Sequence, residues 1–237
     1  MKILKPNLQI AIDGPVAAGK GTISKLLAER LGVLYVDTGA MYRALAFFVH
    51  EQGIDFNEEQ KICDALQEHK PEVSLHMPSE EEKDGRLVTV VLNEEDISWK
   101  IRTEEISQGV SIITRYKCVR DYMVPQQQAL AQKTSVVMEG RDITTRVLPD
   151  ADLKIYMDAA EKIRVKRRYN QLLEKGELIT LKEVAKSLRE RDYRDMHREI
   201  DPLTKSPEAW YLDTSNYSVT EVIDLICKEL RERNLII

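Results

Sequence analysis

A glycine-rich segment, residues 14–22, has the residue types and spacing of a loop that binds phosphate groups. Gly14 and Gly19 allow sharp turns, so that several backbone N–H groups can point towards one anion. Lys20 adds a positive charge for the β- and γ-phosphates of a nucleotide, and the Thr22 hydroxyl is a ligand for Mg²⁺. The predicted nucleotide-binding residues here are Gly14, Pro15, Val16, Ala17, Ala18, Gly19, Lys20, Gly21 and Thr22.

The neighbouring residues support this interpretation. A glycine-rich turn alone is more often structural, but here an apolar strand pattern at residues 8–12 precedes it and a helical pattern at residues 22–31 follows it. The loop therefore lies at a helix N-terminus, where phosphate binds favourably. The residue after Lys20 is Gly21, and the hydroxyl follows at Thr22. The Gly-Lys-Gly-Thr sequence at residues 19–22 resembles the end of the phosphate loop in nucleoside monophosphate kinases more than that in GTPases or motor ATPases.

Two further segments place an acid and an arginine where a predicted strand ends. Residues 37–43 follow the second strand and contain Asp37 and Arg43, and residues 139–142 follow the third strand and contain Arg141 and Asp142. Surface ion pairs are the alternative, and they are common and weak. Because ligands of parallel sheets bind at the carboxyl ends of the strands, we expect ligand contacts here.

The C-terminal third contains two arginine-rich helical patterns. In the first, the spacing that begins with the apolar residues 181, 184 and 188 continues on the same face as Arg191, Asp195 and Arg198. Such charges are costly to bury without partners, so we expect them at a ligand cleft. An intrahelical ladder with neighbouring acids is the alternative. In the second, Arg164, Arg167 and Arg168 share the face of a helix that ends near Gly176, and they form another basic face.

Arginines around a phosphate loop point to phosphoryl transfer, which depends on positioning and charge stabilisation. The sequence shows neither a Ser-His-Asp set nor a His-Glu-x-x-His motif, and no cysteine in a nucleophilic context. If the acceptor is itself a phosphate, its oxygen is already ionised and needs no general base. The four histidines, His50, His69, His76 and His197, are interpreted as structural or surface residues.

Short apolar runs alternate with helical patterns along the chain, which predicts a doubly wound α/β core. The expected parallel strands are residues 8–12, 33–36, 136–138, 153–157 and 210–212. Ser218 and Glu221 have capping-box spacing and predict the start of the last helix. Nearly a hundred residues separate the second and third strands, so we expect an insertion. Within it, residues 73–77 and 87–92 predict a small antiparallel unit, and the acidic residues 80–82 between them are expected to be a solvated loop.

Composition limits the class of protein. The net charge of −5 over 237 residues gives no global basic field for nucleic acid. Cys63, Cys118 and Cys227 are odd in number and scattered, so we expect neither a disulfide nor a zinc site, and a reducing compartment. The longest apolar run, residues 44–49, is too short to cross a membrane. We therefore expect a cytoplasmic monomer with small nucleotides as partners and neither nucleic acid nor membrane.

The chain resembles bacterial cytidylate kinases over essentially its whole length. The matching segments are residues 12–15, 18–22, 37–43, 101–103, 140–142, 190–192 and 194–195. The resemblance implies transfer of a phosphoryl group from ATP, with Mg²⁺, to CMP or dCMP. It also implies one phosphate-loop (P-loop) kinase domain over residues 1–237, in which a five-stranded parallel sheet is flanked by helices. The core would comprise about residues 1–38, 131–160 and 201–237, the acceptor-binding region about 39–130, and a helical lid about 161–200.

The resemblance also implies roles for individual residues. It places Arg43, Arg141 and Arg198 near the CMP phosphate and Thr38 and Tyr42 near the acceptor. Ser111, Arg120 and Asp142 would read cytosine, since an aspartate can accept from N4 and an arginine or hydroxyl can serve N3 and O2. Asp195 and Arg191 would face the acceptor sugar and the transferred phosphate. Arg164 and Arg168 would belong to the lid, with Arg168 towards ATP, and the catalytic charges would be Lys20, Arg141, Arg164 and Arg191.

Two positions depart from the pattern of these kinases. Thr144 stands where they usually have glycine, which could restrict the backbone, and Glu139 stands where many have aspartate, which keeps the charge. Three alternatives remain. A P-loop kinase for UMP, AMP or shikimate is disfavoured by the β insertion and by Arg141 with Asp142. A switch GTPase is disfavoured because no Asn-Lys-x-Asp motif is present, and a nucleic-acid binder is disfavoured by the acidic charge.

Overall fold

The computed structural model describes residues 1–82, 84–174 and 176–237. In chain order the strands are β1 (Gln9–Asp13), β2 (Leu34–Asp37), β3 (Val73–His76), β4 (Thr89–Leu92), β5 (Glu95–Asp96), β6 (Val136–Gly140), β7 (Leu153–Asp158) and β8 (Trp210–Asp213). The α-helices are α1 (Lys20–Leu31), α2 (Thr38–Glu51), α3 (Glu59–His69), α4 (Glu104–Ile113), α5 (Lys117–Lys133), α6 (Glu161–Glu174), α7 (Leu181–His197) and α8 (Val219–Glu232). Short turns of other helix types are η1 (Glu80–Glu82), η2 (Lys100–Arg102) and η3 (Ile143–Val147).

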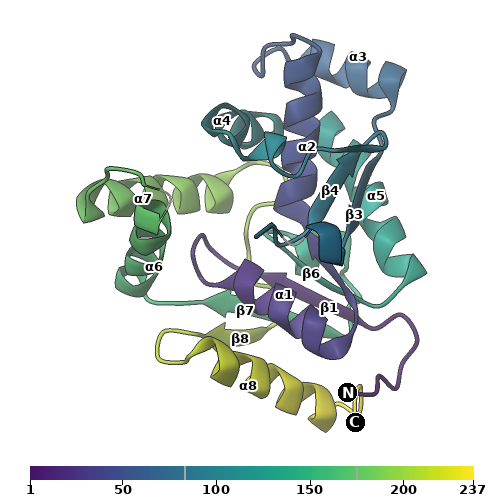
Figure 1. The fold of residues 1–237 in the computed structure, drawn as a ribbon, viewed down its shortest axis with the longest axis vertical. Helices are drawn as coiled ribbons and strands as arrows, with labels where there is room; N and C mark the ends of the chain where they lie inside the picture. The colour runs from purple at the N-terminus through teal and green to yellow at the C-terminus, as the bar shows by residue number, and fades with distance from the viewer. Residues whose placement is uncertain (83, 175) are drawn as a thin grey trace.

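The predicted parallel sheet of five strands is confirmed, and its strand order is β2-β6-β1-β7-β8 (Figure 1). The residues of β1, β6 and β7 are almost continuously buried, which is typical of a parallel sheet covered on both faces, whereas the edge strand β8 has only Leu212 buried. The register pairs Asp13 with Gly140 and Asp37 with Glu139, so the carboxyl ends of three neighbouring strands lie level. Polar side chains far apart in the sequence therefore meet at one edge.

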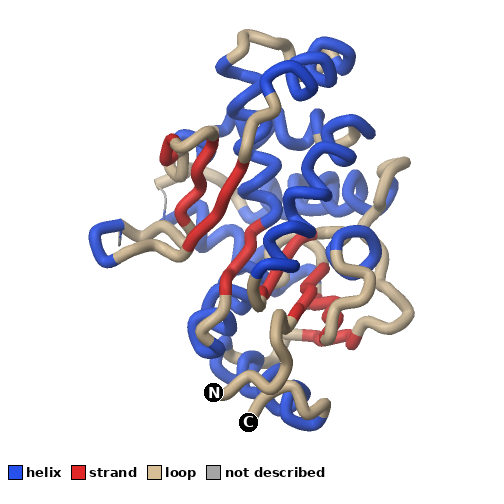
Figure 2. The backbone as a smooth tube through the Cα atoms, turned by 90° about the vertical axis from the view of Figure 1, so that its right-hand side faces the viewer, coloured by secondary structure: helices blue, strands red, loops and turns tan. Residues whose placement is uncertain are grey.

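The described residues of the insertion between β2 and β6 form four α-helices, the short turns η1 and η2, and a separate antiparallel sheet, β3-β4-β5 (Figure 2). The predicted antiparallel unit is confirmed, and β5 was not predicted because it has only two residues. Helices α6 and α7 pack on one another beside the parallel sheet, around a small core of their own that contains Val165, Leu172, Val184 and Leu188. Helix α8 begins with the predicted capping box of Ser218 and Glu221.

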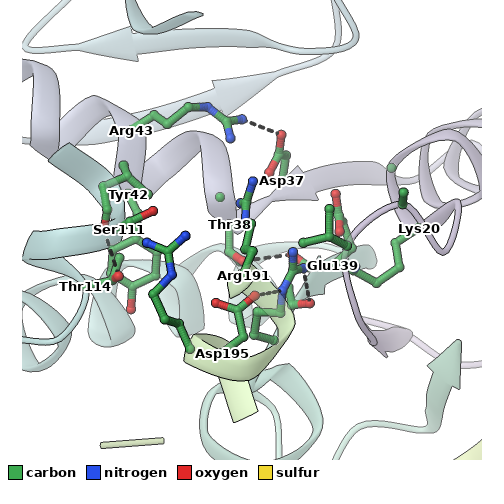
Figure 3. A pocket seen from close by; sticks show the side chains of 18 of the residues that line it. Lys20, Asp37, Thr38, Tyr42, Arg43, Ser111, Thr114, Glu139, Arg191 and Asp195 are labelled. Atoms are coloured by element: carbon green, nitrogen blue, oxygen red, sulfur yellow. Dashed lines mark hydrogen bonds and ion pairs between the residues drawn. The ribbon is translucent and has the colours of Figure 1, made fainter. Parts of the chain in front are cut away.

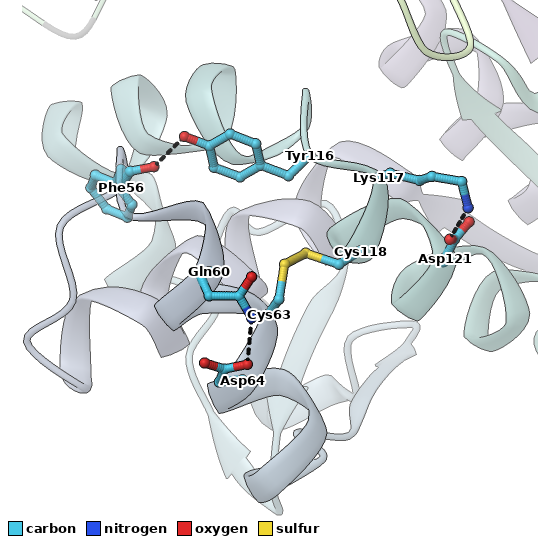
Figure 4. Close-up of a disulfide and its surroundings, with 8 residues drawn as sticks. All are labelled: Phe56, Gln60, Cys63, Asp64, Tyr116, Lys117, Cys118 and Asp121. Carbon is cyan, nitrogen blue, oxygen red and sulfur yellow. Dashed lines mark hydrogen bonds and ion pairs between the residues drawn. A yellow bond between two sulfur atoms is a disulfide. The ribbon is translucent and has the colours of Figure 1, made fainter.

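The prediction that the chain has no disulfide is wrong. Cys63 of α3 and Cys118 of α5 form one, with their Cα atoms 5.7 Å apart, while Cys227 is a buried free thiol (Figure 4). The two cysteines are 55 residues apart. Sequence spacing alone could not reveal the pair, because α3 and α5 come together only through the packing of the insertion.

In the part of the chain that the structure describes, no helix combines the length and the apolar character needed to span a bilayer.

Candidate active site

The predicted phosphate loop lies between β1 and α1. Gly14 adopts φ 152°, and a Cβ atom there would come within 1.9 Å of the Met157 carbonyl oxygen, so only glycine fits. Gly19 is in the left-handed region at φ 100° and precedes the first residue of α1. Lys20 Nζ donates to the carbonyl oxygens of Gly14 and Pro15 at 2.8 and 2.9 Å. The loop is thus wrapped around its own lysine.

Lys20 is buried, and this changes its acidity. Burial, followed by the nearby positive charge of Arg141, lowers the pKa of Lys20 to about 7. A phosphate group at this position would restore the ammonium charge, because an adjacent anion favours the charged form. Lys20 is therefore suited to a ligand that carries its own negative charge.

A cavity of about 530 Å³ opens beside the loop and extends across the carboxyl ends of the strands (Figure 3). Lys20 lies at one end, Tyr42 and Ser111 lie at the other, and Arg191 and Asp195 lie between them. The predicted site residues that line it are Val16, Ala17, Gly19, Lys20, Gly21, Thr22, Thr38, Tyr42, Arg43, Ser111, Arg141, Asp142, Arg168, Arg191, Asp195 and Arg198. Residues that are distant in the sequence therefore form one site.

The middle of the cavity is built around an ion pair between β6 and α7. Arg141 Nε lies 2.8 Å from Asp195 Oδ2. Burial alone would raise the pKa of Asp195, but Arg141, together with Arg191 and Arg198, outweighs this and holds the pKa below its ordinary value. Arg191, one helical turn before Asp195, has its pKa lowered to about 10 because protein atoms displace water from it and Arg141 lies nearby. The helical stripe predicted from the sequence thus reaches the cavity.

The end of β2 contributes a second ion pair. Arg43 Nη2 lies 2.9 Å from Asp37 Oδ2, and the Asp37 side chain also caps α2 by accepting from the Ala40 N–H. The Thr38 hydroxyl donates to the Glu139 carbonyl at 2.8 Å and joins the start of α2 to β6. Asp37 is therefore fixed by a backbone contact and Arg43 by Asp37, and both residues line the cavity.

The far end of the cavity contains a buried cluster of charges. Arg120 is 1% exposed and Asp142 is 5% exposed, and they form a close ion pair. Arg198 Nη2 lies 3.4 Å from the other oxygen of Asp142. The Arg120 guanidinium lies 5.7 Å from the centre of the Tyr42 ring. Burial raises the pKa of Asp142, and the two arginines oppose this.

Some predicted residues lie outside the lining of the cavity. Arg120 stands behind Asp142, while Gly14, Pro15 and Ala18 form the inner side of the loop. The Arg164 guanidinium contacts Asp192 Oδ2 at 2.5 Å and the Val16 carbonyl at 3.1 Å. Asp192 Oδ1 in turn accepts from the Val16 N–H at 3.2 Å. Arg164 therefore joins α6, α7 and the phosphate loop.

A second cavity, of about 310 Å³, adjoins the loop, shares Ala17, Gly19 and Thr22 with the first cavity, and was not predicted from the sequence. Its lining comes from the loop, α6 and the region before α8, and includes Arg167, Asn170, Thr214 and Tyr217. Arg167 donates to the Ala18 carbonyl at 3.1 Å and to Thr214. Thr214 follows the carboxyl end of β8, so the strand-end rule could have identified it. His197, which was interpreted as a structural or surface residue, is exposed, stacks on Tyr193 and lines the first cavity.

The two departures from the expected pattern have structural roles. The Thr144 hydroxyl and its backbone N–H both donate to Asp13 Oδ2 at 2.7 Å. Thr144 is accommodated in η3, and its hydroxyl helps to satisfy a buried carboxylate. Glu139 lines the first cavity, and burial together with Asp37 raises its pKa.

The residues beside Lys20 also suit Mg²⁺, which takes oxygen ligands, keeps several waters and binds through one or two protein groups plus substrate phosphates. Thr22 is exposed at the start of α1, and Asp37 and Glu139 line the same cavity. One hydroxyl and two carboxylates match that donor set.

The chain is similar to known proteins over nearly its full length. A sequence model described as cytidylate kinase matches residues 10–232. A cytidylate kinase of Lactobacillus gasseri is 41% identical over 226 residues, covering 95% of each chain. That of Bacillus subtilis is 39% identical over 231 residues, covering 98% of this chain and 100% of the relative. A solved structure of an uncharacterized protein from Eubacterium ventriosum shares the fold at a TM-score of 0.53, with 13% identity, and covers 94% of this chain and 98% of that one. With a phosphate loop, an arginine-lined cavity and this match, the chain belongs to the cytidylate kinase family.

Proposed function

We propose that the protein transfers the γ-phosphoryl group of ATP to CMP or dCMP and releases ADP and CDP or dCDP. The observation that carries this proposal is the single cavity with a phosphate loop at one end and the Asp142 cluster at the other. Of the polar groups that line this cavity among the described residues, the buried Tyr42 hydroxyl has no hydrogen-bond partner, and Arg198 Nη2 has only its ion pair with Asp142. Buried polar groups usually have one, so these atoms are suited to a polar ligand.

ATP would bind with its β- and γ-phosphates on the loop, where the backbone N–H groups and Lys20 face them. The second cavity, which adjoins the loop and shares Gly19 and Thr22 with the first, would hold the rest of the donor. Thr22 would hold Mg²⁺, which supplies charge compensation to the phosphates when it is bound. Arg168 lines the first cavity near the loop and would contact the donor phosphates.

The acceptor would lie across the rest of the first cavity. Arg43, Arg141 and Arg198 would bind its phosphate, and Asp195 would accept from a sugar hydroxyl. Asp142 would accept from the N4 amino group of cytosine, and Arg120 would hold Asp142 in place. Uracil carries a carbonyl at that position and would be repelled by the carboxylate. Ser111 and Thr38 would add hydroxyl contacts at the cavity wall.

Catalysis would rest on charge and position. The attacking oxygen belongs to a phosphate that is ionised near neutral pH, so no general base is required. Lys20, Arg141 and Arg191 surround the path between donor and acceptor and would stabilise charge on the transferred group. Arg164 would act from the lid by holding Asp192 and the Val16 backbone. Helices α6 and α7 would form that lid over a core, with the segment from α2 to α5 as the acceptor-binding region, and a monomer would contain every group needed.

The test is steady-state transfer from Mg-ATP to CMP, dCMP, UMP, AMP and shikimate by the wild type and Asp142→Ala. We expect CMP and dCMP to be strongly preferred and the cytosine preference to be lost in the variant. Asp150→Ala removes an exposed carboxylate outside both cavities and is the matched control. Preference for another acceptor would refute the cytosine assignment, and no turnover by folded protein would refute the kinase assignment.

A further inference from the structure

Asp201 lies behind the cavity, in the segment that follows α7. Its Oδ2 atom is 2.7 Å from Arg120 Nε, while Arg120 Nη2 contacts Asp142. Arg120 is therefore shared by two carboxylates, of which only Asp142 lines the cavity. Asp201 was not among the site residues predicted from the sequence.

The carboxylate of Asp201 affects which groups the oxygens of Asp142 can contact. A guanidinium that is 1% exposed needs acceptors for its buried donors, and charged hydrogen bonds are the strong ones. If Asp142 were the only carboxylate at Arg120, both oxygens of Asp142 would be drawn to that arginine. Because Asp201 binds Nε, Asp142 contacts the guanidinium through Nη2 and with one oxygen. An oxygen of Asp142 can then face Arg198 and the cavity.

The backbone of Asp201 positions the second arginine of the cluster. Arg198 Nε donates to the Asp201 carbonyl oxygen at 2.6 Å. Asp201 adopts φ 46°, in the left-handed region that residues other than glycine, asparagine and aspartate rarely enter. This conformation turns the chain so that one residue offers its carbonyl to Arg198 and its carboxylate to Arg120.

We propose that Asp201 is a positioning residue that sets Arg120 and Arg198 around Asp142 and thereby supports the selection of cytosine. The proposal rests on the proposed function, because it assumes that Asp142 reads the base. Asp201 acts through the two arginines and remains outside the cavity.

Two substitutions separate the side chain of Asp201 from its backbone. Asp201→Gly removes the carboxylate and tolerates a positive φ, while Asp201→Asn also tolerates it and keeps one oxygen that can accept from Arg120. We expect the KM for CMP to rise about tenfold in Asp201→Gly, in line with the loss of a charged hydrogen bond, and less in Asp201→Asn. The KM for ATP should stay within about twofold, since the phosphate loop is distant in the cavity.

The decisive readout is the ratio of kcat/KM for CMP to that for UMP, which a purely structural role would leave unchanged. We expect Asp201→Gly to lower this ratio about fivefold or more, with partial recovery in Asp201→Asn. Asp121→Asn is the matched control, because Asp121 is an exposed carboxylate that also lies near Arg146, at 3.8 Å, as Asp201 does at 3.9 Å, but has no contact with Arg120 or Arg198 among the described residues. The control should match the wild type in the ratio and in both KM values.

Asp142→Ala, measured in parallel, separates the two proposals. If Asp142→Ala lowers the CMP to UMP ratio while both Asp201 variants keep it, the positioning role is overturned and the base assignment stands. The positioning role is likewise overturned if the Asp201 variants only lower the melting temperature and reduce turnover of every acceptor equally. If Asp142→Ala keeps the ratio, the base assignment fails and the role of Asp201 fails with it.

Discussion

Arg141 Nε and Asp195 Oδ2 lie 2.8 Å apart and join the carboxyl end of β6 to α7. The pair crosses the middle of the main cavity, so the basic face of α7 is held against the strand ends by a contact within the site itself. A ligand that binds Arg141 must therefore adapt to Asp195 as well.

Asp195→Asn should reduce kcat/KM for CMP by roughly tenfold to a hundredfold, because it removes a charged partner of Arg141 and an acceptor for the sugar. The effect should be visible in steady-state kinetics with saturating Mg-ATP. Glu190→Gln is the control, since Glu190 is exposed on the same helix. An Asp195→Asn enzyme with wild-type kinetics would contradict the assignment.

Binding of Mg-ATP should take up protons above pH 7. The pKa of Lys20 in the free protein is lowered to about 7, so at pH 8 most molecules carry a neutral amine there. Bound phosphates would raise this pKa again, so uptake should approach about one proton per site at pH 8 and affinity should fall as pH rises above 7. Calorimetry in two buffers with different ionisation enthalpies measures the uptake.

The control for proton uptake is the same titration at pH 6, where Lys20 is already charged in the free protein. Uptake there should be close to zero. A binding enthalpy that is independent of the buffer at pH 8 would show that Lys20 keeps its charge without ligand.

Thr144→Val should lower the free energy of unfolding by about 1–2 kcal/mol, because it removes a donor to the buried Asp13 carboxylate. Burial raises the pKa of Asp13 to about 6, and the bonds from Thr144 oppose this. The variant should raise that pKa further, so its deficit should be larger at pH 8 than at pH 5. Thr145→Val changes an exposed neighbour and should have little effect in the same denaturant titrations. Equal deficits at both pH values would argue against an ionised Asp13.

Cys63→Ser should lower the free energy of unfolding by up to about 4 kcal/mol, which is the loop entropy expected for a separation of 55 residues. Thiol titration of the denatured, unreduced protein should find one free thiol, that of Cys227. Cys227→Ala leaves the disulfide intact, so its melting temperature should still fall on reduction, whereas that of Cys63→Ser should not respond. Three titratable thiols without reductant would contradict the disulfide.

The sequence predicted the parallel sheet well because its strands are short, buried runs between helical patterns. The predicted ends of all five strands lie within two residues of the ends in the structure. The prediction of β1 and of the loop that follows it required no information about tertiary contacts. The capping box of α8 was equally local, since Ser218 and Glu221 contact each other within one turn. Features of this kind depend on burial periodicity and on residues close in the chain.

The local sequence determined that this protein has a phosphate loop on a parallel sheet, with acids and arginines at the strand ends and a charged stripe on α7. The tertiary structure decided which of these groups face one another: that Arg120 contacts both Asp142 and Asp201, that Arg164 binds Asp192 and the loop, and that Cys63 meets Cys118. The physical reason is the distance along the chain between the residues that interact. Burial patterns and turns are set by neighbours in the chain, whereas a charge or a thiol finds its partner only after separate elements have packed together.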